Sequence, residues 1–254
     1  MKVAICCGRD YRNYRIADEV SKGVKANGDD AKSFWIDSYK SHSIDAFKDD
    51  AEIAIFVGSV FQSLIEQYQR ASIPSIFISE WWHDTEARVG IGIGATYPTN
   101  YLGKIGMPAD RRIKRGWQTL PWRVHSPHAR VVLRCLSDNG EIIRQIRRYT
   151  QRPVHIPVTR IKQSVQGAHC IITSDSQLCL HAMLGGVPVI ALDEAISRNI
   201  SSTTFEYIEY PYLAYNDQRM SWLNDLAYCQ WDSEELQSGL AWQTTKSIMI
   251  KLKE

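Results

Sequence analysis

The sequence predicts an α/β protein with two doubly wound, parallel-sheet lobes and a helical C-terminal tail. Short apolar strands alternate with amphipathic helices near the start of the chain, and the same alternation returns after residue 130. The stretch between them has no clear period. Such alternation is typical of parallel sheets that are covered by helices. We therefore expect one lobe at residues 1–125 and a second, which includes the tail, at residues 126–254.

The first lobe is expected to contain four strands, with a helix after the first and another after the third. Ile16, Val20 and Val24 recur at helical spacing before Gly28, which indicates a helix at residues 15–27. The second helix is expected to turn Phe61, Leu64, Ile65 and Tyr68 inward. The strands are expected at residues 2–7, 31–36, 53–57 and 76–79.

Residues 80–123 interrupt this rhythm and are rich in Gly, Trp, Arg and Pro. Long segments without regular structure are uncommon in compact domains, and they are often functional. The glycine-rich residues 90–96 do not lead from a strand into a helix, so they do not fit a dinucleotide fingerprint. We interpret them as a loop; the alternative is a flexible lid or a close approach of the backbone to the acceptor.

The second lobe repeats the alternation of strands and helices. Strands are expected at residues 130–136, 154–156, 170–173 and 187–192, and helices at residues 141–149 and 161–166. A further helix is expected after the polar residues 174–176, and two or three helices in residues 221–254. The anchors of the tail are expected to be Trp222, Leu223, Leu226, Tyr228, Trp231, Leu240 and Trp242.

The composition is that of an ordinary globular protein. The 254 residues are 44% hydrophobic and 23% charged, and no apolar run approaches the roughly 20 residues that span a bilayer. The N-terminus begins at once with a strand-like segment and does not resemble a signal peptide. The six cysteines form no C-x-x-C pair, so neither a zinc site nor a dithiol redox motif is indicated. The sequence also contains no D-x-D motif, so metal dependence is not indicated. We expect a cytoplasmic protein with neither a membrane partner nor a required metal.

Charge is distributed unevenly along the chain. Residues 104–134 carry eight bases and one acid, a formal charge of +7, whereas residues 193–254 carry ten acids and five bases, a charge of −5. A basic region of this kind suits an anionic partner such as a phosphate-bearing donor or a nucleic acid. The alternative is that the two regions neutralise each other across an interface.

The polar residues Ser174, Asp175 and Ser176 end one predicted strand and open a helix. The first N–H groups of a helix have no partner within the helix and carry partial positive charge, so they suit phosphate. Ligands of open parallel sheets lie at the carboxyl ends of the strands. The segment is therefore the predicted site of a nucleotide diphosphate.

Two segments resemble known glycosyltransferases. Residues 173–176 (TSDS) and 181–190 (HAMLGGVPVI) are similar to the donor-binding half of the GT-B glycosyltransferase fold. Residues 226–231 (LAYCQW) and 238–242 (SGLAW) resemble small glycosyltransferase-like proteins of tailed bacteriophages. The resemblance implies two Rossmann-like lobes that face a cleft. It also implies a nucleotide-sugar donor, with a UDP-sugar as the first choice, and chemistry without a metal.

One departure from the family concerns the donor ribose. Retaining members carry two glutamates where this chain has Thr173 and His181, so Asp193 or Glu194 is the candidate for that contact. Ser137 and Asp138 open a helix near the donor, and Arg160 could neutralise the leaving diphosphate. The complete predicted donor set is Ser137, Asp138, Arg160, Ser174, Asp175, Ser176, Gln177, Asp193 and Glu194.

Transfer to a hydroxyl needs a general base, and inverting enzymes use a carboxylate. Glu80 follows the strand at residues 76–79 and is the first candidate, Asp84 the second, with His83 to orient the base or bind the acceptor. The phage DNA β-glucosyltransferases resemble this arrangement. The alternatives are a capping or arginine-paired carboxylate and a packed histidine.

Arginines and tryptophans are interleaved in the middle of the chain, which suits a nucleic-acid backbone with a stacked or flipped base. The predicted acceptor-binding residues are Trp81, Trp82, Arg111, Arg112, Arg115, Trp117 and Trp122. Double-stranded phage DNA with hydroxymethylated bases is the favoured acceptor. The alternative is a solvated basic loop that its tryptophans pin to the core.

The sequence thus predicts a glycosyltransferase, which would act in the host cytoplasm if a phage encodes it. One alternative is a nucleotide-sugar epimerase of the same two-lobed build. Another is a non-catalytic phage protein that binds a nucleotide or nucleic acid. The sequence leaves open the sugar, the anomeric outcome and the oligomeric state.

Overall fold

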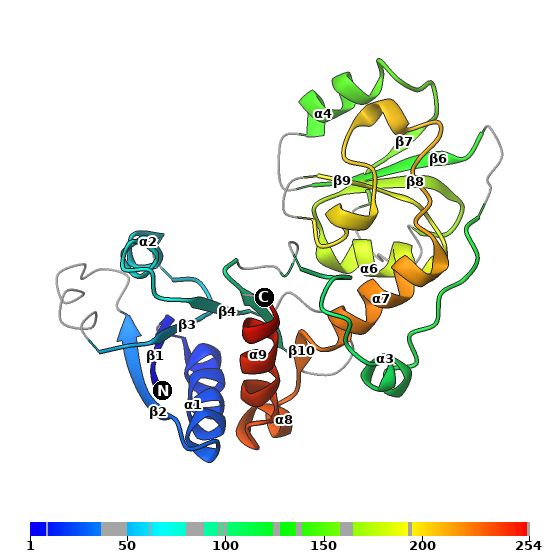
Figure 1. Ribbon diagram of the computed structural model, residues 1–254. Helices are drawn as coiled ribbons and strands as arrows, with labels where there is room; N and C mark the ends of the chain where they lie inside the picture. Colours follow the sequence, from blue (N-terminus) through cyan, green and yellow to red (C-terminus); the bar gives the residue numbers. More distant parts are fainter. Residues whose placement is uncertain are drawn as a thin grey trace. The chain divides into compact units, whose positions relative to one another are not determined.

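The computed structural model divides the chain into two compact units (Figure 1). The first unit consists of Met1–Pro98 and Tyr228–Glu254, and the second of Thr99–Ala227. The structure describes residues 1–8, 10–36, 50–60, 62–79, 89–95, 98, 101–123, 128–135, 139–157, 165–192 and 195–252. This division differs from the expected one in two ways. Residues 99–125 belong to the second unit, and the tail from residue 228 joins the first unit.

A six-stranded sheet forms the centre of the first unit, in the order β10-β5-β4-β3-β1-β2. Its strands are β1 (Lys2–Gly8), β2 (Asp30–Ile36), β3 (Ile53–Val57), β4 (Ser75–Ser79), β5 (Val89–Ile93) and β10 (Gln230–Trp231). The four strands β2, β1, β3 and β4 are parallel, whereas β5 is antiparallel to β4 and β10 antiparallel to β5.

Helices cover both faces of this sheet. They are α1 (Tyr11–Ala26), α2 (Gln62–Arg70), α8 (Ser233–Gln237) and α9 (Leu240–Lys251). Because side chains alternate along a strand, Val3, Ile5 and Cys7 of β1 pack in one buried cluster with α1, α8 and α9. Ala4 and Cys6 pack in a second cluster with α2 on the other face. The parallel strands, buried on both faces, therefore read as continuous apolar runs.

Helix α1 begins four residues earlier than expected, and its cap explains why. The Asp10 carboxylate accepts hydrogen bonds from the backbone N–H groups of Arg12 (3.0 Å) and Asn13 (2.9 Å). Asp10 therefore satisfies two of the N–H groups that a helix start leaves without partners.

The second unit contains a four-stranded parallel sheet, in the order β7-β6-β8-β9. Its strands are β6 (Arg130–Arg134), β7 (Val154–His155), β8 (Ala168–Thr173) and β9 (Val189–Ala191). The helices described here are α3 (Asp110–Lys114), α4 (Asn139–Ile146), α6 (Ser176–Gly185), the 3₁₀ turns η2 (Arg198–Ile200) and η3 (Phe205–Tyr207), and α7 (Asn216–Ala227).

Both units share one order of parallel strands: β2-β1-β3-β4 in the first and β7-β6-β8-β9 in the second. The mixed α/β class with Rossmann-like parallel sheets is thereby confirmed. The cleft between two facing lobes stays a prediction. The helix expected at residues 161–166 lies largely outside the described residues.

Two strands were not predicted. β5 lies in the glycine-rich segment that we interpreted as a loop, and β10 lies in a tail for which only helices were expected. Gln230 and Trp231 pair with Gly90 and Val89, respectively. This pairing brings the tail onto the sheet edge of the first unit.

Candidate functional site

The carboxyl edge of the second sheet holds the predicted diphosphate segment. From β6 the chain crosses to β7 on one side and then to β8 on the other, so the strand order reverses between β6 and β8. Ligands of doubly wound sheets bind at such a switch point. The two strands end there with Arg134 and Thr173, which are paired in register.

Thr173 links the two strand ends to the start of α6. Its hydroxyl donates to the Arg134 carbonyl oxygen (2.6 Å) and accepts from the Asp175 N–H (2.9 Å). Asp175 is the N-cap of α6, and its Oδ1 accepts from the Leu178 N–H (2.8 Å). The Arg134 Nε lies 3.1 Å from the Asp175 Oδ2. A guanidinium, a carboxylate and a helix N-terminus therefore converge on one edge.

The first turn of α6 supplies further hydrogen-bonding groups. Ser176 is 6% exposed, and its hydroxyl has no hydrogen-bond partner within the described part of the chain. The N–H groups of Ser176 and Gln177 belong to the turn whose donors have no acceptors in their own helix. Ser174 and Gln177 are partly exposed. The turn thus combines backbone donors, partial positive charge and the nearby Arg134, which suits a phosphate group.

Helix α4 begins near the same edge. The Cys135 thiol, just after β6, contacts the Asn139 Oδ1 at 3.2 Å. Ser137 and Asp138 lie outside the described residues, as do Arg160, Asp193 and Glu194. Of the predicted donor set, the structure therefore brings together residues 174–177 and adds Arg134 and Thr173.

The first unit has its own switch point, between β1 and β3. Gly8 ends β1 and Gly58 follows β3, and the Asn13 side chain hydrogen-bonds the Asp10 carboxylate beside them. A Cβ atom on Gly58 would overlap the Asn13 side chain. Asn13 thus fills the space that the missing side chain of Gly58 leaves.

The predicted catalytic residues Glu80, His83 and Asp84 lie outside the described residues, as do Trp81 and Trp82. Strand β4 ends at Ser79, so Glu80 does follow the carboxyl end of a parallel strand. Its role as a base stays a prediction.

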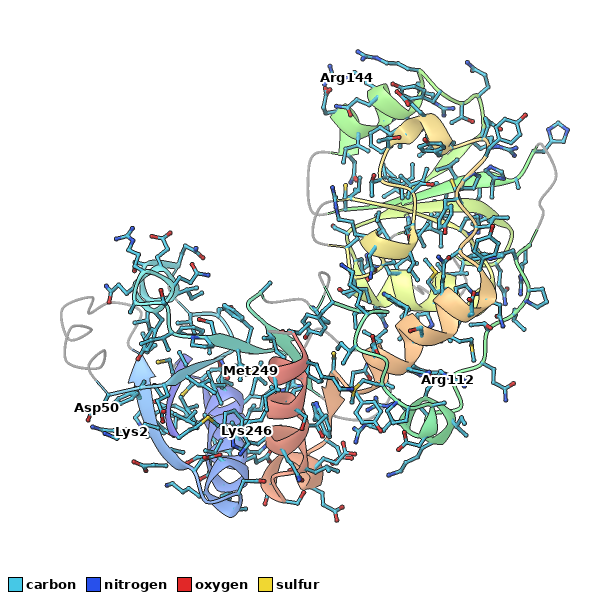
Figure 2. The ribbon with its side chains drawn as sticks, in the orientation of Figure 1. Lys2, Asp50, Arg112, Arg144, Lys246 and Met249 are labelled. Atoms are coloured by element: carbon cyan, nitrogen blue, oxygen red, sulfur yellow. The ribbon has the colours of Figure 1, made fainter. Side chains whose placement is uncertain are left out.

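Two of the predicted acceptor-binding arginines are buried inside the second unit. Arg112 donates from Nε to the Asn224 Oδ1 and from Nη1 to the Trp117 carbonyl oxygen, both at 2.7 Å. Figure 2 shows Arg112 on α3. The Arg111 Nε donates to the Ala227 carbonyl oxygen (3.3 Å). These contacts attach α3 to α7, and they favour a structural role for both guanidiniums.

The other acceptor-binding candidates differ in exposure. Trp117 is buried, and the partly exposed Arg115 places its Cζ 5.4 Å from the Trp117 ring centroid. Trp122 is half-buried and donates from Nε1 to the Ala214 carbonyl oxygen (2.9 Å). Lys114 and Arg123 are exposed. Between residues 111 and 123, the accessible positive charge thus comes from Lys114, Arg115 and Arg123.

Burial raises the pKa of four cysteine thiols to about 12, those of Cys6, Cys7, Cys170 and Cys179. A thiol with such a pKa stays protonated at neutral pH and is a poor nucleophile.

The described residues include no cluster of three or more His, Cys, Asp or Glu side chains that could hold a metal ion. Within the same residues, we find no helix that is long and apolar enough to cross a bilayer.

The sequence matches no protein family and no curated protein. Among similar solved structures is the mitochondrial ornithine carbamoyltransferase of Coccidioides immitis, with 12% identity over 90% of this chain and 83% of that one and a TM-score of 0.29. A 5,10-methylenetetrahydrofolate dehydrogenase of the silkworm Bombyx mori has 12% identity, coverage of 95% and 88%, and a TM-score of 0.29. A 3-phosphoglycerate dehydrogenase of Entamoeba histolytica has 8% identity, coverage of 89% and 93%, and a TM-score of 0.24. Similarities this weak carry no argument about function.

Proposed function

We propose that this protein is a glycosyltransferase that moves a sugar from a nucleotide-sugar, with a UDP-sugar as the first candidate, to a hydroxyl acceptor. The observation that carries the proposal is the convergence of Arg134 with the first turn of α6 at the switch point of the second sheet. The sugar-transfer chemistry rests on the resemblance of residues 173–176 and 181–190 to GT-B donor sites.

The proposed edge meets the main electrostatic demand of sugar transfer. When the acceptor oxygen bonds to the anomeric carbon, the bond to the diphosphate oxygen breaks and the nucleotide diphosphate leaves with the electron pair. The Arg134 guanidinium and the N–H groups of Ser176 and Gln177 would stabilise that growing negative charge. A donor phosphate would take over the contact that the Asp175 carboxylate now makes with Arg134.

The proposed base is Glu80, which would take the proton of the acceptor hydroxyl. Asp84 is the second candidate for this role, and His83 would orient the base. The proposed acceptor is a hydroxymethylated base in double-stranded DNA. Lys114, Arg115 and Arg123 would contact its phosphates, and Trp81, Trp82 and Trp122 would contact the extruded base.

Donor binding is the first test. Isothermal titration of UDP-glucose and related nucleotide-sugars should give a measurable Kd for the full chain. The Arg134→Gln variant should weaken binding about tenfold to a hundredfold, because a charge-assisted hydrogen bond contributes roughly 1.5–3 kcal/mol. Arg144→Gln is the matched control, since Arg144 is exposed on α4 of the same unit and pairs with Glu141 (Figure 2).

Sugar transfer is the second test. Labelled sugar should enter hydroxymethylated duplexes and not unmodified ones, and Glu80→Gln should abolish transfer while donor binding persists. Interconversion of free UDP-sugars without an acceptor would identify an epimerase instead. Binding without any turnover, unaffected by Glu80→Gln, would identify a non-catalytic binder. If no nucleotide-sugar binds, the proposal is wrong.

A further inference from the structure

Arg219 is a buried cation that forms no salt bridge with any carboxylate in the described part of the chain. It lies in α7 with 2% of its surface exposed. Its Nη2 donates to the Leu120 carbonyl oxygen (2.7 Å), and its Cζ lies 4.2 Å from the ring centroid of Trp122. Its Nε and Nη1 have no hydrogen-bond partner, and the described residues offer it no carboxylate. Two nitrogens of a charged group are therefore buried without an acceptor from the described residues.

Such an arrangement is energetically unfavourable by itself. A buried charge is tolerated when it is paired and hydrogen-bonded, and otherwise its desolvation costs several kcal/mol. Burial accordingly lowers the pKa of Arg219. Arg112, buried in the same unit, shows the contrast, because both its Nε and its Nη1 donate to acceptors at 2.7 Å. Arg219 therefore lacks the acceptors that Arg112 has.

A short surface segment covers the guanidinium. We name residues 119–123 the strap; they have no regular secondary structure. Its Leu120 N–H donates to the Leu184 carbonyl oxygen (2.9 Å), and its Arg123 N–H donates to the Gly186 carbonyl oxygen (2.8 Å). These two backbone hydrogen bonds hold the strap against the C-terminal end of α6.

The outer side of the strap faces solvent. Leu120 is 47% exposed, and Pro121 and Arg123 are exposed as well. Trp122, the ring that covers Arg219, is half-buried and is tied to the residues before α7 by its bond to Ala214. The two strap residues that contact the guanidinium, Leu120 and Trp122, are therefore both partly exposed to solvent.

We propose that Arg219 is the receptor for one oxyanion, a phosphate or a carboxylate, which enters beneath the strap and pairs with the guanidinium. The anion would accept a hydrogen bond from one of the two unsatisfied nitrogens, because Nε–H and Nη1 lie on opposite edges of the guanidinium, and it would neutralise the buried charge. This site is independent of the proposed donor site, because it uses α7 and the strap, whereas the donor site uses the carboxyl edge of β6 and β8. It does not depend on the protein being a glycosyltransferase.

The test measures the melting temperature of the full chain in titrations of inorganic phosphate and of acetate, with chloride holding the ionic strength constant. Phosphate should raise the wild-type melting temperature by about 3 °C or more at saturation. Arg219→Met should lose this response. In buffer without phosphate it should melt no lower than wild type, since an unpaired buried charge has been replaced by an apolar chain. Arg144→Met should behave as wild type.

Two further variants make the assignment specific. Arg219→Lys keeps the charge but has one nitrogen in place of three, so the apparent phosphate affinity should fall at least about tenfold. This variant also serves if Arg219→Met does not fold. Arg134→Gln should keep the response, which separates this site from the donor site. A response to acetate as well as phosphate would point to a carboxylate ligand, and a response to phosphate alone to a phosphate ligand.

The outcomes that overturn the proposal are distinct. Equal stabilisation of wild type and Arg219→Met by phosphate would place the anion elsewhere. Absence of any response in wild type to both anions would show that no oxyanion binds at Arg219. A large loss of stability in Arg219→Met, with no anion response in wild type, would show that the guanidinium is a structural support for the strap.

Discussion

At the scale of single residues, Asp175 has two opposing effects on the proposed donor site. It caps α6 through the Leu178 N–H, which favours the helix start, but its second oxygen occupies Arg134 at 3.1 Å. A carboxylate beside a proposed phosphate site repels the ligand. The Asp175 Oδ2 lies beside Arg134, at the position that we propose for an anionic oxygen of the donor.

This arrangement predicts that Asp175→Asn tightens the binding of a nucleotide-sugar. Asparagine caps a helix about as well as aspartate, so α6 should keep its start. The negative charge disappears and Arg134 becomes available, so the Kd measured by titration should fall severalfold. Weaker binding in this variant, at unchanged stability, would show that the carboxylate itself contacts the donor.

A second residue-scale prediction concerns Asp225, a fully buried carboxylate on α7. It accepts hydrogen bonds from the N–H groups of Gly103 (2.7 Å), Ile105 (3.0 Å) and Met107 (2.8 Å). Asp225→Asn would put an amide against donors and should lower the free energy of unfolding by about 3 kcal/mol in urea denaturation. The exposed Asp217 on the same helix is the control. Asp217→Asn should change the free energy of unfolding by less than about 0.5 kcal/mol.

The candidate site was predictable from sequence in part. Residues 174–177 stood out because a buried strand, a polar loop and an apolar helix follow one another along the chain. Arg134 did not, because a basic residue at a strand end looks like ordinary surface until β6 and β8 are known to be neighbours. The burial of Arg112 was hidden for the same reason, since its acceptor Asn224 lies 112 residues further on.

At the scale of elements, close contact between helices in the first unit depends on Gly23. A Cβ atom at this position of α1 would overlap the backbone carbonyl oxygen of Leu236 in α8. Glycine is therefore required here, although it weakens a helix interior elsewhere.

Gly23→Ala should accordingly destabilise the protein, although replacing glycine by alanine inside a helix usually raises stability. We expect a loss of about 1–3 kcal/mol in the free energy of unfolding, because α8 must move away from α1. The exposed Lys22→Ala on the same helix should change it by less than about 0.5 kcal/mol. Unchanged or higher stability of Gly23→Ala would contradict the close packing of α1 and α8.

Asp29 ties the tail helix α9 to the turn before β2. The Lys246 Nζ and the Trp242 Nε1 each lie 2.7 Å from its Oδ2. Figure 2 shows Lys246 on α9. Burial alone would raise the pKa of Asp29. Hydrogen bonds from Lys246, the terminal ammonium and Trp242 outweigh burial, however, and hold that pKa well below its usual range.

A pH dependence follows from this lowered pKa. The folded state favours the charged carboxylate, so its contribution is present above the unfolded pKa of about 4 and is lost as pH falls towards the folded value. Asp29→Asn should lower the free energy of unfolding by about 2 kcal/mol at pH 7. This difference from wild type should become smaller below about pH 4. A difference that stays constant down to pH 2 would contradict the role of this carboxylate. Asp18→Asn, at an exposed pair on α1, should show no such difference.

Helices and strands were predictable where buried apolar residues recur at a regular spacing in the sequence. The apolar runs of β1, β3, β4 and β8, and the apolar face of α1 with Ile16, Val20 and Val24, predicted the positions of these elements to within a few residues. β5 was missed because glycine at residues 90 and 92 removes the alternation that marks a strand. β10 contains only two residues, and its pairing with β5 is set by a segment 140 residues away in sequence.

At the scale of the whole molecule, the chain leaves the first unit after Pro98 and returns to it at Tyr228. The returning segment contributes the edge strand β10 and the helices α8 and α9. Buried Trp231, Leu236 and Trp242 join the same core cluster as β1 and α1. We assigned this segment to the second lobe because it follows that lobe in the sequence. No local sequence pattern indicates that it packs on the first unit.

Deletion of residues 228–254 should therefore damage the first unit and leave the second folded. We expect limited proteolysis to cleave within residues 1–98 and to leave a resistant fragment of about residues 99–227. Deletion of residues 252–254 alone is the control and should leave the digestion pattern unchanged. A truncated chain in which residues 1–98 stay resistant would show that the tail adds nothing essential to that core.

The return of the chain also has a consequence for biosynthesis. Residues 99–227 are complete before the ribosome has delivered the segment that finishes the first unit. The earliest-made part of the protein must therefore wait, with the apolar face under α9 uncovered, while the later-made unit is already able to fold. Nascent chains usually fold their N-terminal domains first. In this chain the core of the first unit lacks Trp231, Leu236 and Trp242 until residues 228–254 are made, so its completion must follow the synthesis of the second unit.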